Sequence, residues 1–268
     1  MVAAIRIDDP DDPRVQPYRA VRERDLVGRS GLFVAEGRVV LEKLVAGGRH
    51  PLRSVLVAEH RLVGLEDVLA PLADGVLVYA AGQAVMDVIA GFPIHRGILA
   101  VGARAEPSPG SLLAALPERA LVVGLSAIAN HDNMGGIFRN AAAFGADAVL
   151  LDAACCDPLY RKAIRVSVGA ALTTPFARLG AGQDVAGALA GAGFQVLALS
   201  PRGEIELDEV RPSPRTAVIF GAEGPGLAGE LLTRTTAVRI AMAGGFDSLN
   251  VATTSGIVLH RLARLRAG

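Results

Sequence analysis

The chain has 268 residues and a formal net charge of zero, so nothing global in its charge indicates a nucleic-acid partner. Its hydrophobic content of 51% can fill a sizeable core, but no uninterrupted apolar segment is long enough for a membrane helix. A chain of this length forms one large domain or two smaller ones, and we expect two.

The amino terminus is rich in aspartate between Met1 and Pro13 and lacks the basic start and apolar stretch of a secretory signal. We therefore expect a soluble, cytoplasmic protein without a membrane partner. The only cysteines, Cys155 and Cys156, are adjacent in the chain and are expected to be reduced and buried. The histidines show no spacing typical of a zinc site, so we predict no metal.

The amino-terminal part of the chain predicts a small α/β unit. Residues 14–30 mix arginines with acidic residues and are typical of an exposed helix or arm. From Glu36, apolar residues with helical spacing run to a glycine stop at Gly47 and Gly48. Short β-rich runs then alternate with helical pieces. These segments are 54–57, 65–72, 76–79, 83–89 and 98–101.

Between Arg104 and Glu118 the composition shifts to proline, serine and glycine, which is typical of a linker. We therefore expect an arm and first domain at 1–104, a linker at 105–118 and a second domain at 119–268.

The second domain contains five continuous apolar runs separated by helical patterns. They lie at 121–123, 148–151, 196–199, 217–220 and 238–242. Strands without apolar–polar alternation are buried on both faces, which predicts a parallel sheet covered by helices. Ligands of such sheets bind at the carboxyl ends of the strands, and three polar or glycine-rich motifs stand there.

The first motif spans residues 130–140 and contains Asn133 and Arg139. On a single helix these two residues would lie on different faces, so they meet only if Asn133 precedes the helix. Gly135 and Gly136 favour a turn followed by a helix that begins near Ile137. Arg139 would then project from the first helical turn toward the strand ends. Taken alone, it is as well explained as a surface arginine.

The second motif is the glycine-rich loop 221–226, where a ligand could approach backbone amides without obstruction. Its spacing matches neither common phosphate-binding fingerprint, which argues against a nucleotide dehydrogenase. Within it, Glu223 taken alone could be a solvated loop carboxylate. The third motif, 244–251, places two glycines before a helix that Asp247 or Ser248 could cap.

Asn133…Arg139, Gly221…Glu223…Gly226 and Ser248–Val251 together resemble, in order and separation, the three motifs of the SpoU/TrmH branch of the SPOUT RNA methyltransferases. The resemblance runs from Leu121 to Leu265. Residues 34–37 and 97–100 are similar to the RNA-binding domain attached to many of these enzymes. The resemblance implies a 2'-O-ribose methyltransferase that uses S-adenosylmethionine, forms a homodimer and contains a carboxy-terminal trefoil knot.

The resemblance also implies roles for individual residues. Arg139 would activate the ribose hydroxyl, either as proton acceptor or as an orienting group, since the pKa of arginine, above about 12, makes it an awkward base. Asn133 would position Arg139 or the ribose, and Glu223 would order the loops. The remaining site residues are Ser248 and Asn250 across the strand ends, Gly221, Ile240, Met242 and Leu249 around the cofactor, and the basic patch Arg161, Lys162 and Arg165 for RNA.

The chain departs from the family pattern at three positions. His131 and Ala241 stand where proline is usual, and Thr254 stands where the final helix usually has alanine. An amino-terminal domain of this type is common in enzymes that act on ribosomal RNA, so we expect large-subunit ribosomal RNA as substrate, with transfer RNA as the alternative. A catalytically silent RNA-binding or ribosome-assembly factor and a nucleotide-dependent oxidoreductase are the other classes considered.

Overall fold

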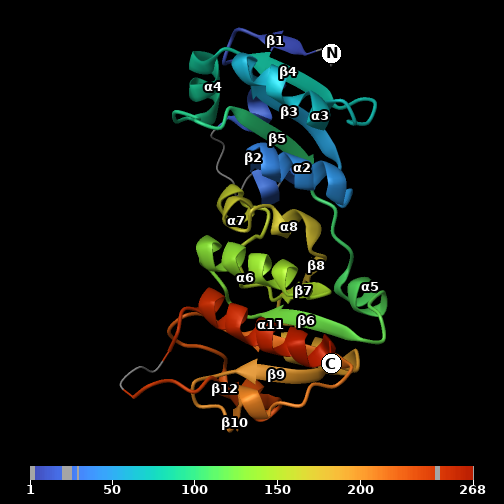
Figure 1. The fold of residues 1–268 in the computed structure, drawn as a ribbon, viewed down its shortest axis with the longest axis vertical. Helices are drawn as coiled ribbons and strands as arrows, with labels where there is room; N and C mark the ends of the chain where they lie inside the picture. Colours follow the sequence, from blue (N-terminus) through green and yellow to red (C-terminus); the bar gives the residue numbers. More distant parts are fainter. Residues whose placement is uncertain (1–3, 20–25, 29, 245–247, 268) are drawn as a thin grey trace. The chain divides into compact units, whose positions relative to one another are not determined.

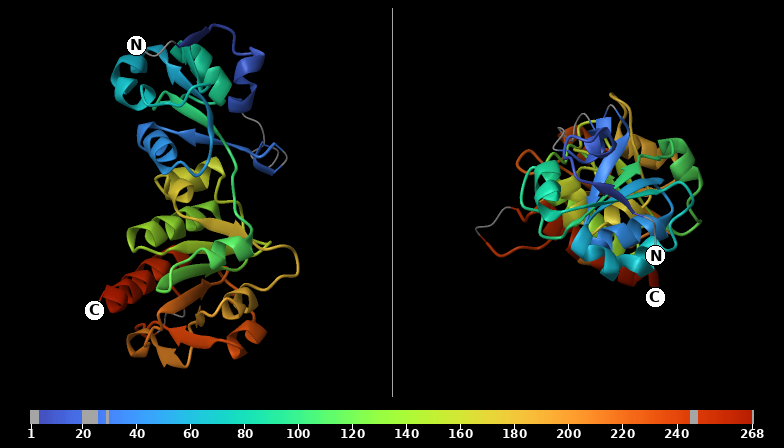
Figure 2. Two further views of the ribbon diagram at one scale, coloured as in Figure 1. Left: turned by 90° about the vertical axis from the view of Figure 1, so that its right-hand side faces the viewer. Right: turned by 90° about the horizontal axis from the view of Figure 1, so that it is seen from above.

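The computed structural model describes residues 4–19, 26–28, 30–244 and 248–267 (Figures 1 and 2). Three arginines of the predicted arm and one residue of the third motif lie outside the described residues. They are Arg22, Arg24, Arg29 and Asp247. Contacts group the chain into two compact units, Met1–Ala105 with Leu159–Thr173, and Glu106–Pro158 with Thr174–Gly268. The predicted domain boundaries stay a proposal.

The first unit is built on a mixed five-stranded sheet in the order β1-β4-β3-β5-β2. Its strands are β1 (Ile5–Ile7), β2 (Leu32–Glu36), β3 (Leu52–Ala58), β4 (Leu77–Ala81) and β5 (Ile98–Ala103). Its helices are α2 (Arg38–Gly47), α3 (Glu66–Leu69), α4 (Gln83–Ala90), α7 (Arg161–Val166) and α8 (Ala170–Thr173), with short 3-10 turns η1 (Pro13–Tyr18) and η2 (Glu59–Leu65). The expected small α/β unit is confirmed.

The start of the chain differs from the expected exposed arm. Val15 and Tyr18 are buried in the core of the first unit, and the Tyr18 hydroxyl donates a hydrogen bond to Ser54 Oγ at 2.6 Å. Burial raises the pKa of Tyr18 far above its usual value. An aromatic ring with a satisfied hydroxyl is stable inside a core, so the neighbouring arginines and aspartates gave a misleading impression of exposure.

The second unit contains a seven-stranded sheet with parallel pairing throughout, in the order β10-β12-β9-β11-β6-β7-β8. Its strands are β6 (Ala120–Leu125), β7 (Ala148–Leu151), β8 (Phe176–Arg178), β9 (Gln195–Leu199), β10 (Ile205–Glu206), β11 (Arg215–Phe220) and β12 (Thr236–Arg239). The parallel α/β architecture is confirmed, whereas the trefoil knot stays a prediction.

Two sequence expectations for the second unit need correction. The last apolar run forms a strand only as far as Arg239, and Ile240 and Met242 lie in the loop beyond it. The expected linker contains helix α5 (Pro109–Ala114), which Ser108 caps by accepting a hydrogen bond from the Ser111 amide at 3.1 Å. This helix buries its two leucines, Leu112 and Leu113, in the core of the unit.

The other helices of this unit are α6 (His131–Ala143), α9 (Val185–Gly191), α10 (Gly229–Thr233) and α11 (Val251–Ala267). Helix α6 begins six residues earlier than Ile137, because Asn130 Oδ1 accepts a hydrogen bond from the Asp132 amide at 2.7 Å and caps it there. Gly135 and Gly136 are therefore helical residues, and the predicted turn at this point is wrong.

Helices α6 and α11 lie side by side (Figure 1). A Cβ atom on Gly136 would come within 2.7 Å of the Ala252 Cβ, so only glycine permits this approach. Next along the contact, Asn140 Nδ2 donates to Ala252 O at 2.7 Å and to Ser255 Oγ at 2.9 Å. The glycine of the first motif thus serves helix packing. None of the described helices is long and apolar enough to cross a membrane.

Replacing Gly136 with alanine should therefore destabilise the second unit by about 1–3 kcal/mol, the usual cost of an overpacked contact. Urea unfolding followed by circular dichroism measures this. Gly191→Ala is the matched control, because a Cβ at that helical glycine meets no atom within 4 Å, so the free energy of unfolding should stay the same or rise by up to about 1 kcal/mol. Equal stabilities of the two variants would contradict the packing role of Gly136.

Candidate active site

A cleft of about 760 Å³ opens at the carboxyl ends of β9, β11 and β12, a size typical of small-molecule sites. Four loop segments, α10 and the start of α11 supply its walls. The lining residues are Leu199–Arg202, Phe220–Leu227, Leu232, Ile240, Met242, Ser248–Val251 and Thr254. This is the edge of a parallel sheet where ligands are expected to bind.

The loop after β11 is a tight turn closed on itself. The Gly226 amide donates to Ala222 O at 3.1 Å, and a Cβ on Gly221 would lie 2.7 Å from the backbone of Gly226. Gly224 and Gly226 have φ angles of 87° and 68°, which glycine adopts without strain. The glycines therefore fold the loop so that Glu223 is exposed on the cleft wall.

Asn250 joins the three motifs through its side-chain amide. Its Nδ2 donates to Asn133 Oδ1 at 2.9 Å and to Glu223 Oε1 at 2.8 Å. Its Oδ1 accepts hydrogen bonds from the amides of Ala252 and Thr253, at 2.9 and 3.1 Å, and so caps α11. Of the two residues that were predicted as possible caps, Ser248 does not cap the helix, because α11 begins two residues later than a Ser248 cap requires, and Asp247 lies outside the described residues.

Asn133 and Arg139 do not meet. Both lie on α6, six residues apart, and so face different directions. Asn133 is buried and pairs with Asn250, whereas Arg139 is exposed and is not among the residues that line the cleft. The expectation that Asn133 precedes the helix and contacts Arg139 is therefore wrong, because Asn130 starts the helix too early.

The structure brings together most of the predicted site residues. The cleft is lined by Glu223, Ser248 and Asn250 and by all four residues expected around a cofactor, Gly221, Ile240, Met242 and Leu249. Leu249 is 41% exposed, so an apolar side chain is presented at the cleft without a covering partner. Thr254, one of the departures from the family pattern, donates its hydroxyl to Asn250 O at 3.1 Å.

The segment Leu199–Arg202 was not among the predicted site residues. It directly follows the apolar run 196–199, so the same rule that placed the three motifs at strand ends would have found it. Leu232 was also missed, and it belongs to α10 with no motif near it.

The loops after β6 and β7 are held by Asp152. Its Oδ2 accepts hydrogen bonds from Ser126 Oγ and from the Ala127 amide, both at 2.9 Å, and this fixes Ala127 at a φ of 56°.

Both cysteines are free. Burial raises the pKa of Cys155 to about 12 and that of Cys156 to about 11. Raised pKa values keep both thiols protonated at neutral pH, which disfavours a nucleophilic role.

Arg161 has a structural environment within the first unit. Its guanidinium forms an ion pair with Glu36 at 3.0 Å, where both side chains are largely buried, and lies 4.8 Å from the Phe92 ring centroid. Lys162 and Arg165 are exposed. RNA binding by these three residues stays a prediction, with Arg161 also needed for packing.

We expect Arg161→Ala to destabilise the first unit by about 3 kcal/mol, since it leaves the Glu36 carboxylate buried without its ion pair. Lys162→Ala and Arg165→Ala should change the free energy of unfolding by less than about 0.5 kcal/mol. Each of these two should instead lower the salt slope of RNA binding by a little under one unit. Unchanged thermal unfolding of Arg161→Ala would exclude the structural role.

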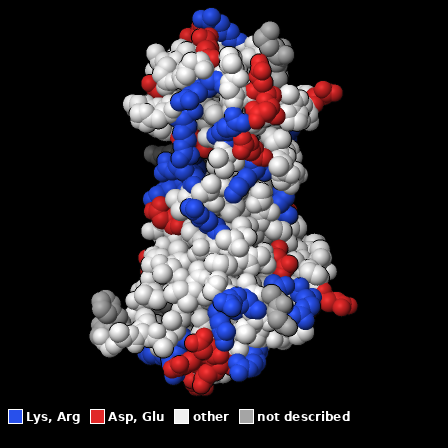
Figure 3. All heavy atoms as spheres, viewed as in Figure 1, with Lys and Arg blue, Asp and Glu red and all other residues white. Residues whose placement is uncertain are grey.

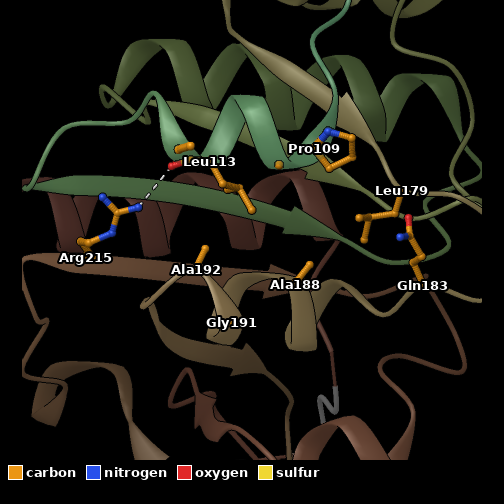
Figure 4. Close-up of a pocket in the computed structure, with 10 residues that line it drawn as sticks. Pro109, Leu113, Leu179, Gln183, Ala188, Gly191, Ala192 and Arg215 are labelled. Carbon is orange, nitrogen blue, oxygen red and sulfur yellow. Dashed lines mark hydrogen bonds between the residues drawn. The ribbon is translucent and has the colours of Figure 1, made fainter.

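A second cavity of about 480 Å³ lies between α5 and α9 (Figure 4). Its only charged lining residue among those described is Arg215, whose guanidinium donates to Pro117 O at 2.9 Å and Leu113 O at 3.3 Å. The arginine also lies 4.3 Å from the Phe194 ring centroid. These contacts hold α5 on the sheet, so Arg215 is engaged in packing. In the described part of the chain, no three His, Cys, Asp or Glu residues gather as a metal site.

The sequence profile of the SpoU rRNA Methylase family matches residues 120–260. An uncharacterized tRNA/rRNA methyltransferase of Mycobacterium tuberculosis is 39% identical over 266 residues, which cover 96% of this chain and 90% of that protein. The AdoMet-bound rRNA methyltransferase of Sinorhizobium meliloti has a TM-score of 0.85 at 23% identity, over 97% of this chain and 98% of that one. A solved RNA 2'-O ribose methyltransferase has a TM-score of 0.78 at 24% identity, over 98% and 100%.

Proposed function

Because the chain belongs to the SpoU family of RNA methyltransferases, we propose that it transfers a methyl group from S-adenosylmethionine to a ribose 2'-hydroxyl of large-subunit ribosomal RNA. The observation that carries this proposal is the junction at Asn250, where one side chain joins all three motifs beside the cleft. A silent RNA-binding factor would have no need for this arrangement of polar side chains around a small-molecule cleft.

The cleft fits S-adenosylmethionine in size and in chemistry. Its walls combine apolar side chains, including Ile240, Met242 and Leu249, with the open backbone of the loop that starts at Gly221. These surfaces suit an adenosyl group, and the exposed carboxylate of Glu223 suits a cationic ligand. When bound, the cofactor supplies an electrophilic methyl group. The protein's own task is to hold ligand and ribose in line.

Positioning of this kind can supply roughly 7–11 kcal/mol of a two-substrate barrier. We assign Arg139 to the RNA side, where its exposed guanidinium can bind a phosphate and orient the attacking hydroxyl. Asn133 acts on the cofactor side through Asn250, and Asn250 in turn holds Glu223. Ser248 lines the cleft and is proposed to contact the reacting substrates.

We propose a homodimer that uses the surface of α6 and α11. Figure 3 shows an area without charged side chains over part of these helices, and Ile257 on α11 is 40% exposed. An uncharged face with an exposed isoleucine favours contact with a second copy. The cytoplasm, where unassembled ribosomal RNA is found, is the proposed location.

The proposed substrate rests on the amino-terminal unit and on the rRNA methyltransferase with which the chain aligns over nearly its whole length. Transfer RNA is the alternative. Purified protein is offered methyl-labelled S-adenosylmethionine with ribosomal RNA and with transfer RNA, and the labelled nucleotides are tested for alkali-resistant linkages, the mark of 2'-O-methylation. Label in ribosomal RNA at alkali-resistant positions supports the proposal. Label in transfer RNA alone contradicts the substrate, and alkali-sensitive label contradicts the 2'-O position.

A further inference from the structure

The turn Ser200–Gly203 at the end of β9 is fixed against the neighbouring strand β12. The Ser200 amide donates to Val238 O at 2.9 Å, and the Gly203 amide closes the turn by donating to Ser200 O at 3.0 Å. Arg239 Nη1 donates to Gly203 O at 2.8 Å, and a Cβ on Gly203 would lie 2.7 Å from the Arg239 amide nitrogen. The backbone that carries Arg202 is thus held in one conformation.

Arg202 is the only cationic residue, and Glu223 the only acidic residue, among the described residues that line the cleft. The Arg202 side chain is exposed, and its guanidinium has no ion pair with the described carboxylates. Its backbone amide contacts Ser200 Oγ at 3.3 Å, which leaves the side chain uninvolved in the turn. An exposed guanidinium at a cleft that pairs with none of the described carboxylates is a ready site for a carboxylate or phosphate ligand.

We propose that Arg202 binds the α-carboxylate in the methionine part of S-adenosylmethionine and of its product, S-adenosylhomocysteine. This rests on the cofactor of the proposed function. The carboxylate is the only anionic group of either molecule, and Arg202 is the only described cation in the cleft. Glu223 on the same cleft would attract the cationic amino group next to that carboxylate.

An RNA phosphate is the competing ligand for Arg202. A phosphodiester has no cationic group for Glu223 to attract, and it would bring a negative charge to the same cleft as that carboxylate. The cleft also presents apolar side chains, among them Leu199 and Leu249, and a phosphate has no apolar surface to pack against them. These features favour an amino acid zwitterion joined to an apolar group.

Calorimetric titration of the full-length protein with two ligands tests the assignment. The first is S-adenosylhomocysteine, and the second is its decarboxylated form, S-adenosyl-3-thiopropylamine, which keeps the amino group. Arg202→Ala should weaken binding of S-adenosylhomocysteine by about 10- to 100-fold, as expected for a lost charge-assisted contact. The decarboxylated ligand should bind wild type and variant within about twofold. Arg202→Lys should lose less, because it keeps the charge without the planar fork.

Arg211→Ala is the matched control. Arg211 is an exposed arginine of the same unit whose guanidinium contacts only backbone carbonyls of residues 208–210, so this change should leave both affinities unaltered. Equal weakening of both ligands by Arg202→Ala, or no weakening of either, overturns the assignment. Unchanged ligand affinity together with weaker RNA binding would place Arg202 on a phosphate instead. If wild type binds neither ligand, the proposed cofactor itself fails.

Discussion

Replacing Arg139 with alanine is expected to lower the rate of methyl transfer to RNA by about 10²- to 10⁴-fold, the usual contribution of a group that assists proton transfer. The same change should leave the affinity for S-adenosylhomocysteine within about threefold, because Arg139 is exposed on α6 and does not line the cleft. Single-turnover assays at saturating RNA measure the rate, and calorimetry measures the affinity.

Arg139→Lys should rescue little of the rate, since an ammonium group cannot make the two parallel hydrogen bonds of a guanidinium to phosphate. The Arg211→Ala protein again removes one exposed arginine from the same unit and should keep wild-type turnover. Near-normal methyl transfer by either Arg139 variant would remove this residue from the mechanism. A large loss of cofactor affinity would instead move Arg139 to the cofactor side.

The sequence predicted five of the seven strands of the parallel sheet, because each of these five contains a continuous apolar run and that signal is local. It missed β8 and β10, which are only three and two residues long and contain no such run. The strand-end rule also placed the three motifs at one edge. It could not separate Val238 from Ile240 and Met242, since all three are apolar. Val238 is buried in strand β12, whereas Ile240 and Met242 line the cleft. Composition cannot distinguish an apolar side chain that packs on protein from one that faces a ligand.

The errors at the first motif have a common physical cause. Gly136 was assigned to a turn because glycine is flexible, whereas the structure uses its lack of a side chain against Ala252. The partner is more than a hundred residues away in the chain, so no local pattern reports the contact. The same holds for the bond between Asn133 and Asn250, which determines which side of the site Asn133 serves.

Asn250 is the position at which capping of α11 and joining of the motifs can be separated by substitution. Asn250→Ala removes the cap, at a cost of about 1 kcal/mol. It also leaves the buried Asn133 without its hydrogen-bond donor, which costs a further 1–3 kcal/mol or so. This variant should therefore lose stability and ligand binding together.

Asn250→Asp should behave differently. Aspartate caps a helix as well as asparagine does, and its charge is favourable at a helix amino terminus. The free energy of unfolding of this variant should therefore exceed that of Asn250→Ala by about 1 kcal/mol or more. The new carboxylate cannot donate to Asn133 or to Glu223, however, and it repels the Glu223 carboxylate, whose Oε1 lies 2.8 Å from Asn250 Nδ2 in the wild-type protein. The loop that carries Glu223 is then no longer held at the cleft.

We therefore expect Asn250→Asp to lose less stability than Asn250→Ala, because it keeps the cap of α11, yet to bind S-adenosylhomocysteine at least about tenfold more weakly than wild type, the equivalent of one lost hydrogen bond. Glu223→Gln is the companion variant, because its amide oxygen can still accept from Asn250. It should keep the loop in place and lose less affinity. Wild-type affinity in Asn250→Asp would mean that Asn250 only caps α11, since a residue that joins the motifs cannot lose its donor without releasing Glu223.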